Sequence, residues 1–233
     1  MNQPSVEALS DERLRGASAF QLLHWMAAGQ VGSARLQAVQ AEAIARLDPL
    51  LHAFVSLNPA AAAEARASDA RRAARGAIGR LDGLTVAVKD NIDVAGLPTT
   101  LGLASRAGAI AARDAGVVAR LRAAGAVIVG KTALDEGTLG TTGSTGAGGA
   151  VGNAHRAGVI AGGSSAGSAV AVAAGLCSFA LGTDTLGSAR IPASHAGVFG
   201  LHPTPGEIAT HGVVPSARRL DSIGILARSV QDI

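Results

Sequence analysis

A short apolar run from Leu84 to Lys89 constrains the fold of this 233-residue chain most strongly. The run is rich in β-branched residues and is bounded by Asp82-Gly83 and Asp90-Asn91, which is typical of a buried strand. Helices and further strands are expected to alternate after it, at 115–124 (helix), 126–129 (strand), 167–176 (helix) and 179–183 (strand). Such alternation predicts an α/β fold.

The first third of the chain has a helical pattern instead. Helices are expected over 18–28, 33–47 and 60–75, with Ser18 and Ser33 as N-caps and Pro49 ending the second helix. Residues 137–158 consist almost entirely of small residues and are expected to form a loop. We therefore expect one partial domain over 1–233, in which an N-terminal helical layer at 8–75 covers an α/β core at 76–233.

The composition excludes several functional classes. Glycine accounts for 31 of 233 residues, well above the usual share of about 7%, which indicates close approaches of backbone to backbone or to a ligand. The chain has four Phe, one Trp and no Tyr, too few rings for a surface that stacks nucleic-acid bases. Its net charge is only +3 and its cations form no long block, so direct nucleic-acid binding is not expected.

The sequence predicts a soluble cytoplasmic protein with no membrane segment. Cys177 is the only cysteine, so no intramolecular disulfide can form. Met1–Ser5 lack the pattern of a signal peptide. Residues 157–183 carry no charge before Asp184, but their apolar part, 166–181, is shorter than the roughly 18–20 residues that cross a bilayer.

A phosphate-binding motif is matched in letters by Gly125–Thr132, which reads G-x-x-x-x-G-K-T. A helix is expected before Gly125 where the motif needs a strand, and the four internal residues have the character of a strand themselves. Their amides would then be committed to a sheet and could not cradle a phosphate. We therefore expect Lys131 to be a structural cation at a strand end.

A nucleophile elbow is matched by Gly163–Gly167, which reads G-x-S-x-G with Ser165 at its centre. Asp184 and His195 follow in the order of an α/β-hydrolase triad, but the segment before the motif is a poor strand. An α/β-hydrolase with Ser165 as nucleophile thus remains an alternative.

Three features together indicate chemistry. Lys89, one of only two lysines, stands at the end of the first strand, and a buried lysine loses proton affinity and can act as a base. Two separate turns rich in Gly and Ser follow it, at 162–168 and at 182–194. Each turn alone could be structural, but the three features fit a single site.

The residues in these three segments resemble the amidase signature hydrolases. The resemblance rests on LDGLTVAVKDN at 81–91, GGSSAGSA at 162–169 and GTDTLGSARIPAS at 182–194, in which Ser188 follows Ser164 at a spacing of 24 positions. It implies a mixed β-sheet core flanked by helices. It also implies that Ser188 is the nucleophile and Lys89 the base. Ser164 would follow a cis peptide bond and form the bridge between these two residues.

The implied reaction is hydrolysis of a linear amide to an acid and ammonia or an amine. Neutral Lys89 would draw the proton of Ser188 through Ser164, and Ser188 would form an acyl-enzyme that water then hydrolyses. The backbone N–H groups of Thr185, Leu186, Gly187 and Ser188 are candidates for the oxyanion hole, although Leu186 replaces a glycine found in many relatives. Three residues would support the turn around the nucleophile: Ser165, Asp184 and Arg190.

No cofactor or metal is expected, because the histidines lack the spacing of metal ligands (His155, His195, His202 and His211). The only partner implied directly is a small-molecule amide substrate. The chain stops at 227–233, a segment that relatives carry in mid-chain, so the C-terminal part of the usual fold would be missing. An incomplete sheet exposes an edge and apolar surface, which predicts self-association or a partner protein.

Two further alternatives remain open at this point. The chain could be the glutaminase component of a tRNA-dependent amidotransferase, which uses the same machinery together with partner subunits. It could also be a non-catalytic remnant that folds but turns nothing over.

Overall fold

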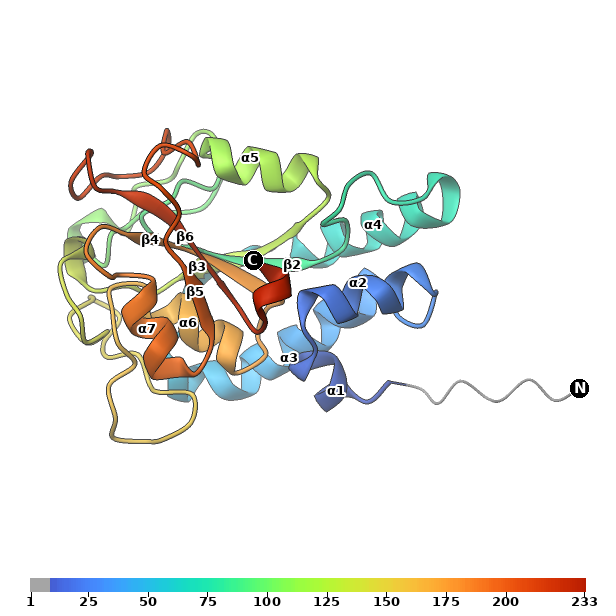
Figure 1. The fold of residues 1–233 in the computed structure, drawn as a ribbon, viewed down its shortest axis with the longest axis horizontal. Coiled ribbons are helices and arrows are strands. Elements are labelled where there is room, and N and C mark those ends of the chain that lie inside the picture. The colour runs from blue at the N-terminus through green and yellow to red at the C-terminus, as the bar shows by residue number, and fades with distance from the viewer. Residues whose placement is uncertain (1–8) are drawn as a thin grey trace, which may run out of the picture.

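The expected strand around Lys89 lies in the middle of a six-stranded mixed sheet in the computed structural model, which describes residues 9–233 (Figure 1). The sheet has the order β1-β3-β2-β4-β6-β5. Strand β2 is parallel to β3 and β4, while β1, β5 and β6 are each antiparallel to the strands they pair with. The strands are β1 (Phe54–Leu57), β2 (Thr85–Lys89), β3 (Val127–Thr132), β4 (Phe179–Asp184), β5 (Phe199–Leu201) and β6 (Ser222–Ala227).

Helices cover both faces of this sheet, so the α/β fold with a mixed sheet is confirmed. Side chains alternate across the central strand: Val86 and Val88 pack into one apolar cluster and Ala87 into another. Both faces of β2 are fully buried, as expected for a parallel strand covered on two sides. The helices are α1 (Asp11–Gly16), α2 (Ala19–Ala27), α3 (Ser33–Leu51), α4 (Ala61–Arg75), α5 (Gly116–Ala123), α6 (Ala166–Ala173) and α7 (Arg190–Ala196).

Helix α6 lies centrally on one face of the sheet. It contacts β2, β3, β4 and β6, and all of its residues are Ala, Val, Gly or Ser. Gly167 allows the closest approach, since a Cβ there would lie 2.2 Å from the carbonyl oxygen of Ala53. Small residues thus let the helix sit directly on the strands whose ends carry the candidate site.

The cap predicted at Ser18 is confirmed, because its side chain and Gln21 form a reciprocal capping box at the start of α2. The cap predicted at Ser33 is wrong. Gly32 occupies the N-cap position of α3, and the Ser33 hydroxyl donates to the carbonyl of Gly83 instead. The carboxylate of Asp69 accepts from the backbone N–H of Ser33, at 2.6 Å, and so caps the helix from outside.

Several boundaries differ from those expected. Helix α3 continues to Leu51 with Pro49 inside it, rather than ending before the proline. The N-terminal helical layer also contributes a strand, because β1 lies within it and pairs with β3 at the edge of the sheet. Strands β5 and β6 and helix α7 were not predicted. Met1–Ser5, assessed above for a signal peptide, lie outside the described residues.

Over residues 9–233, no helix combines the length and the apolar character that a bilayer crossing requires. Cys177 is buried and forms no disulfide. Burial raises the pKa of its thiol to about 12, so it is a small core residue and not a thiolate at neutral pH.

Candidate active site

The candidate site lies where the central parallel strands end. Lys89 is the last residue of β2, Thr132 the last of β3 and Asp184 the last of β4. Strand register places Lys89 opposite Thr132. The carboxyl ends of parallel strands are where open α/β sheets bind ligands, because loops and helix N-termini converge there.

Lys89 is completely buried, and its amine faces two hydroxyls. Its Nζ lies 2.8 Å from Oγ of Ser164 and 2.9 Å from Oγ1 of Thr183. Burial lowers the pKa of Lys89 from 10.5 to about 7, although the carboxylates of Asp184, Asp135 and Asp221 oppose the shift. A large fraction of the amine is therefore neutral at physiological pH and can accept a proton.

Ser164 reaches Lys89 from the turn that precedes α6. The peptide bond between Gly163 and Ser164 is cis, as the resemblance implied. The turn is packed against Asp135: a Cβ on Gly163 would lie 2.0 Å from its Oδ2. Asp135 itself is held by the backbone N–H groups of Gly143, Ser144 and Thr145. This buried carboxylate therefore ties the loop after β3 to the serine turn.

Ser165 is buried and connects the serine turn to β4. Its hydroxyl donates to the carbonyl of Thr183 at 3.1 Å, and its backbone N–H donates to the carbonyl of Ser188 at 2.9 Å. Gly182 leaves room for this contact, because a Cβ there would lie 2.8 Å from Oγ of Ser165. Ser165 thus holds together the two turns that carry Ser164 and Ser188.

Ser188 is half-buried, in contrast to the completely buried Ser164 and Ser165. The structure brings its backbone beside the serine turn through Ser165. Within residues 9–233 the hydroxyls of Ser164 and Ser188 are not hydrogen-bonded to each other. A proton relay through Ser164 requires these two hydroxyls to come within hydrogen-bond reach, and hydrogen bonds between active-site groups are often long before substrate binds.

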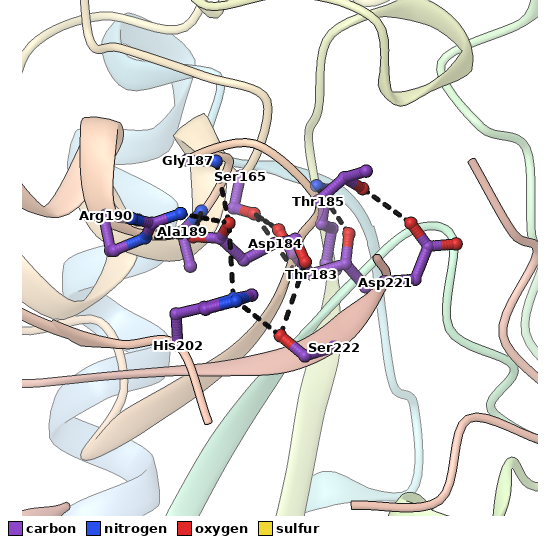
Figure 2. Close-up of polar contacts among 11 residues, drawn as sticks. Ser165, Thr183, Asp184, Thr185, Gly187, Ala189, Arg190, His202, Asp221 and Ser222 are labelled. Atoms are coloured by element: carbon purple, nitrogen blue, oxygen red, sulfur yellow. Dashed lines mark hydrogen bonds and ion pairs between the residues drawn. The ribbon is translucent and has the colours of Figure 1, made fainter. Parts of the chain in front are cut away.

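Asp184 organises the turn that follows β4, in which it contacts Gly187, Ala189 and Arg190 (Figure 2). Its buried carboxylate accepts from the backbone N–H groups of Gly187, Ala189 and Arg190 and from the guanidinium of Arg190. Burial raises the pKa of Asp184, but these donors outweigh it and lower the pKa to about 2. Nδ1 of His202 lies 3.4 Å from the same carboxylate.

One of the four candidate donors for the oxyanion hole is engaged within the turn itself. The N–H of Gly187 donates to the carboxylate of Asp184 at 2.7 Å. In the described part of the chain the N–H groups of the other three positions have no backbone or side-chain acceptor: Thr185, Leu186 and Ser188. Leu186 is 81% exposed, which places this part of the turn at the surface.

Lys131 and Ser165 have structural roles and do not perform the functions of the phosphate-binding motif and the nucleophile elbow that their segments match. Lys131 lies within β3 and forms a buried ion pair with Asp90 at 2.9 Å, so Gly125–Thr132 cradles no phosphate. The α/β-hydrolase triad is not assembled either. The Ser165 hydroxyl donates to the carbonyl of Thr183, and the Asp184 carboxylate pairs with Arg190. In the part of the chain that the structure describes, the His195 side chain forms no hydrogen bond with Ser165 or Asp184.

Sequence reasoning missed three residues that shape the site. Thr183 contacts Lys89 directly, Asp135 packs on the serine turn, and Asp221 accepts from the Thr185 hydroxyl at 2.6 Å (Figure 2). Thr183 lies within the motif at 182–194, and Asp135 follows the end of β3, so their positions in the sequence could have indicated that they lie near the site. Asp221 lies before β6, which was not expected, and offered none.

Comparison with known proteins agrees with this geometry. Residues 36–233 match the family described as Amidase. The chain is 45% identical to the A-type component of a glutamyl-tRNA(Gln) amidotransferase from Cyanothece sp., over 82% of this chain and 40% of the relative. It is 42% identical to the corresponding amidotransferase component of Thermus thermophilus, over 89% of this chain and 43% of the relative.

Solved structures show the same fold. Peptide amidase from Stenotrophomonas maltophilia superposes with a TM-score of 0.89 and 38% identity, covering 98% of this chain and 47% of that one. An amidase family protein from Bacillus anthracis gives a TM-score of 0.90 and 32% identity, covering 95% and 46%. The chain therefore spans less than half the length of these relatives. The matched family, the fold and the arrangement of Lys89 and the two serine turns together show that this chain belongs to the amidase family.

Proposed function

We propose that this chain carries the reaction centre of an amide hydrolase in which Ser188 is the nucleophile, Ser164 the bridge and Lys89 the base. One observation carries the proposal: a fully buried lysine amine with a pKa of about 7 lies 2.8 Å from a serine hydroxyl. A serine hydroxyl needs such a base to become a useful nucleophile. The half-buried position of Ser188 leaves it within reach of a substrate.

The proposed acylation moves one proton along the relay. As Oγ of Ser188 attacks the amide carbon, its proton passes to Ser164, and the proton of Ser164 passes to Lys89. The C–N bond then breaks, and the leaving nitrogen takes a proton back from Lys89 by the same path. Water attacks the resulting ester and the relay runs again, which releases the acid and frees Ser188.

Charge on the substrate oxygen would be stabilised by backbone N–H groups of the turn after β4. Thr185, Leu186 and Ser188 supply the candidates, and each such donor is typically worth about 2.7–4 kcal/mol in the transition state. Asp184 and Asp221 hold this turn from two sides and so fix the direction of its N–H groups.

A reactive probe tests the proposal without knowledge of the substrate. Phenylmethanesulfonyl fluoride reacts with an activated serine much faster than with an ordinary hydroxyl, and mass spectrometry locates the adduct. We expect the adduct on Ser188, with labelling abolished in Ser188→Ala. The control is Ser165→Ala, which removes a buried structural hydroxyl and is expected to leave the adduct on Ser188. An adduct on Ser165 would favour the α/β-hydrolase alternative, and no adduct would indicate a non-catalytic remnant.

A second candidate is the glutaminase component of a tRNA-dependent amidotransferase. The curated relatives named above are A-type components of glutamyl-tRNA(Gln) amidotransferases, and this is the observation that favours it. Release of ammonia from glutamine only in the presence of partner subunits and charged tRNA would support this candidate. Hydrolysis of simple amides by the chain alone would support an independent amidase.

We also propose that another polypeptide, either a second copy or a different partner chain, covers part of this protein. Strand β5 lies at an edge of the sheet with Phe199 46% exposed. An apolar groove of about 600 Å³ also opens between the sheet and the helices that flank it, lined in part by Phe20, Leu23, Phe179 and Ile225. Apolar surface of this kind favours association.

Substitution at the open edge tests this association. In Phe199→Lys we expect sedimentation velocity to show loss of self-association, because a charged side chain blocks edge pairing. Leu50→Lys is the matched control, since Leu50 is 77% exposed on α3, away from that edge. An unaltered chain that is monomeric and precipitates no faster than Phe199→Lys would contradict self-association at this edge and leave a different partner chain as the occupant.

A further inference from the structure

Asn91 lies two residues beyond Lys89 and is 2% exposed. Its Nδ2 donates to Oγ1 of Thr183 at 3.2 Å and lies 3.4 Å from the carbonyl oxygen of Val214. A carbonyl can only accept hydrogen bonds, so Val214 fixes which way the amide is turned. Nδ2 therefore faces Thr183, and Asn91 acts there as a donor.

The oxygen of the same amide makes no such contact in the described part of the chain. Oδ1 of Asn91 is buried and accepts no hydrogen bond from residues 9–233. An acceptor left unpaired in the interior costs stability. The hydrogen bonds of this side chain within residues 9–233 are thus made by its donor group alone, to Thr183 and to Val214.

Thr183 is shared between Asn91 and the lysine amine. Its Oγ1 lies 2.9 Å from Nζ of Lys89 as well as 3.2 Å from Asn91. A hydroxyl oxygen can accept two hydrogen bonds, one from each neighbour. A neutral amine has two N–H groups and one lone pair. When one N–H points to Thr183, the lone pair is free to face Ser164 at 2.8 Å.

We propose that Asn91 is a positioning residue for the proton relay: it holds the Thr183 hydroxyl as an acceptor and so aims the lone pair of Lys89 at Ser164. The inference rests on the proposed function, because it assigns a task to Asn91 only if Lys89 accepts the proton of Ser164. Without the Asn91 donor, the Thr183 hydroxyl can turn and donate its own proton to the amine. It would then compete with Ser164 for the same lone pair.

The charged groups around the amine come from other elements. Asp184 lies at the end of β4, Asp135 in the loop after β3, and Asp221 just before β6. Arg190 and His202 also contact the carboxylate of Asp184. Asn91 is uncharged, so its replacement by leucine leaves this set of charges unaltered and changes only the hydrogen bonding of the amine.

The test measures the rate of Ser188 labelling by phenylmethanesulfonyl fluoride between pH 5 and pH 10. In Asn91→Leu we expect the plateau rate at high pH to fall about tenfold, the equivalent of one hydrogen bond. We also expect the midpoint of the acidic limb to move to lower pH, because the ammonium form loses a well-oriented acceptor. A purely structural residue would lower the amount of folded protein without moving this midpoint.

A double-mutant cycle distinguishes action through Thr183 from independent effects. In Thr183→Val, which removes the shared hydroxyl, we expect Asn91→Leu to cause less than a twofold further change. Asn58→Leu is the matched control, because Asn58 donates to Glu64 and to the Ile128 carbonyl outside the site. It is expected to keep both the rate and the midpoint of the unaltered chain.

A second variant covers the case in which Asn91→Leu does not fold. Asn91→Asp keeps the shape, removes the donor and adds a charge near Lys89, so the plateau should fall while the midpoint moves to higher pH. Unchanged profiles in the Asn91 variants that fold, or full additivity with Thr183→Val, would contradict the role of Asn91 alone. An unaltered chain that is not labelled at Ser188 would contradict the proposed function itself.

Discussion

Replacing Lys89 by methionine is expected to abolish the reactivity of Ser188 and, at the same time, to stabilise the fold near neutral pH. The first effect follows because the amine is the base in contact with Ser164, and a general base is worth about 10²–10⁴ in rate. Sulfonyl fluoride labelling measures the loss. The second effect follows from burial, because the folded chain holds Lys89 with a pKa of about 7 while an unfolded lysine has a pKa of 10.5.

The direction of the pH dependence follows from the same shift. Between about pH 7 and pH 10.5 the unfolded chain binds a proton at Lys89 that the folded chain does not, so the unfolding free energy rises with pH. The slope from one such group is about 1.4 kcal/mol per pH unit. Methionine removes the ionisable group, so Lys89→Met should lose this slope and be more stable than the unaltered chain at pH 7.

The second buried lysine provides the control for this prediction. Lys131 is paired with Asp90 at 2.9 Å and also donates to the carbonyl of Pro98. Lys131→Met leaves a buried carboxylate without its partner, which typically costs about 3–5 kcal/mol. In urea unfolding at pH 7, Lys89→Met should therefore be more stable than the unaltered chain, and Lys131→Met less stable. A Lys89→Met variant that is less stable than the unaltered chain would contradict an amine whose burial costs stability at neutral pH.

Replacing Asp184 by alanine is expected to cause the largest loss of stability in the site, roughly 3–5 kcal/mol. The carboxylate accepts from the backbone N–H groups of Gly187 and Ala189 and from both the backbone and the guanidinium of Arg190. Alanine leaves these donors without an acceptor and releases the turn that carries Ser188. Urea unfolding measures the loss of stability, and the rate of Ser188 labelling is expected to fall with it.

The lowered pKa of Asp184 also predicts that the folded chain loses stability in acid. Its pKa is about 2 in the folded chain against 3.8 for an unperturbed aspartate. The stability that it contributes is therefore present above about pH 4 and is lost as the pH falls toward 2. Arg190→Met is the matched comparison, because it removes the guanidinium but keeps the backbone donors, and it should weaken this acid dependence only in part. Equal acid profiles in Asp184→Ala and the unaltered chain would contradict the assignment.

Local sequence patterns predicted which strand end and which turns carry the candidate catalytic residues. The apolar run at 84–89 ends at a lysine, so its boundary placed Lys89 at a strand end before any contact was known. The Gly-Ser turn at 162–168 and the turn at 182–194 likewise placed Ser164 and Ser188 in turns. The structure adds the burial of Lys89 and its contact with Ser164, which depend on residues 75 positions apart.

The features that local patterns missed depend on contacts between distant segments. Asp69 caps α3 from 36 residues away and so displaces Ser33. Asp221 reaches Thr185 across 36 residues, and the N–H of Gly187 is taken by a carboxylate whose rotamer no pattern reveals. The edge strand β1 is short and only half-buried, with neighbours that form helices, so it offered no apolar run.

The charge state of Lys89 is the central claim, and the composition allows it to be measured directly. Lys89 and Lys131 are the only lysines in the chain, so protein labelled with ¹³C-lysine gives two side-chain Cε resonances. Lys89→Met assigns one of them by its disappearance. We expect that resonance to titrate with a midpoint near pH 7, as the lysine loses its proton within the folded chain. A Lys89 resonance that stays fully protonated up to pH 9 would contradict the proposed relay.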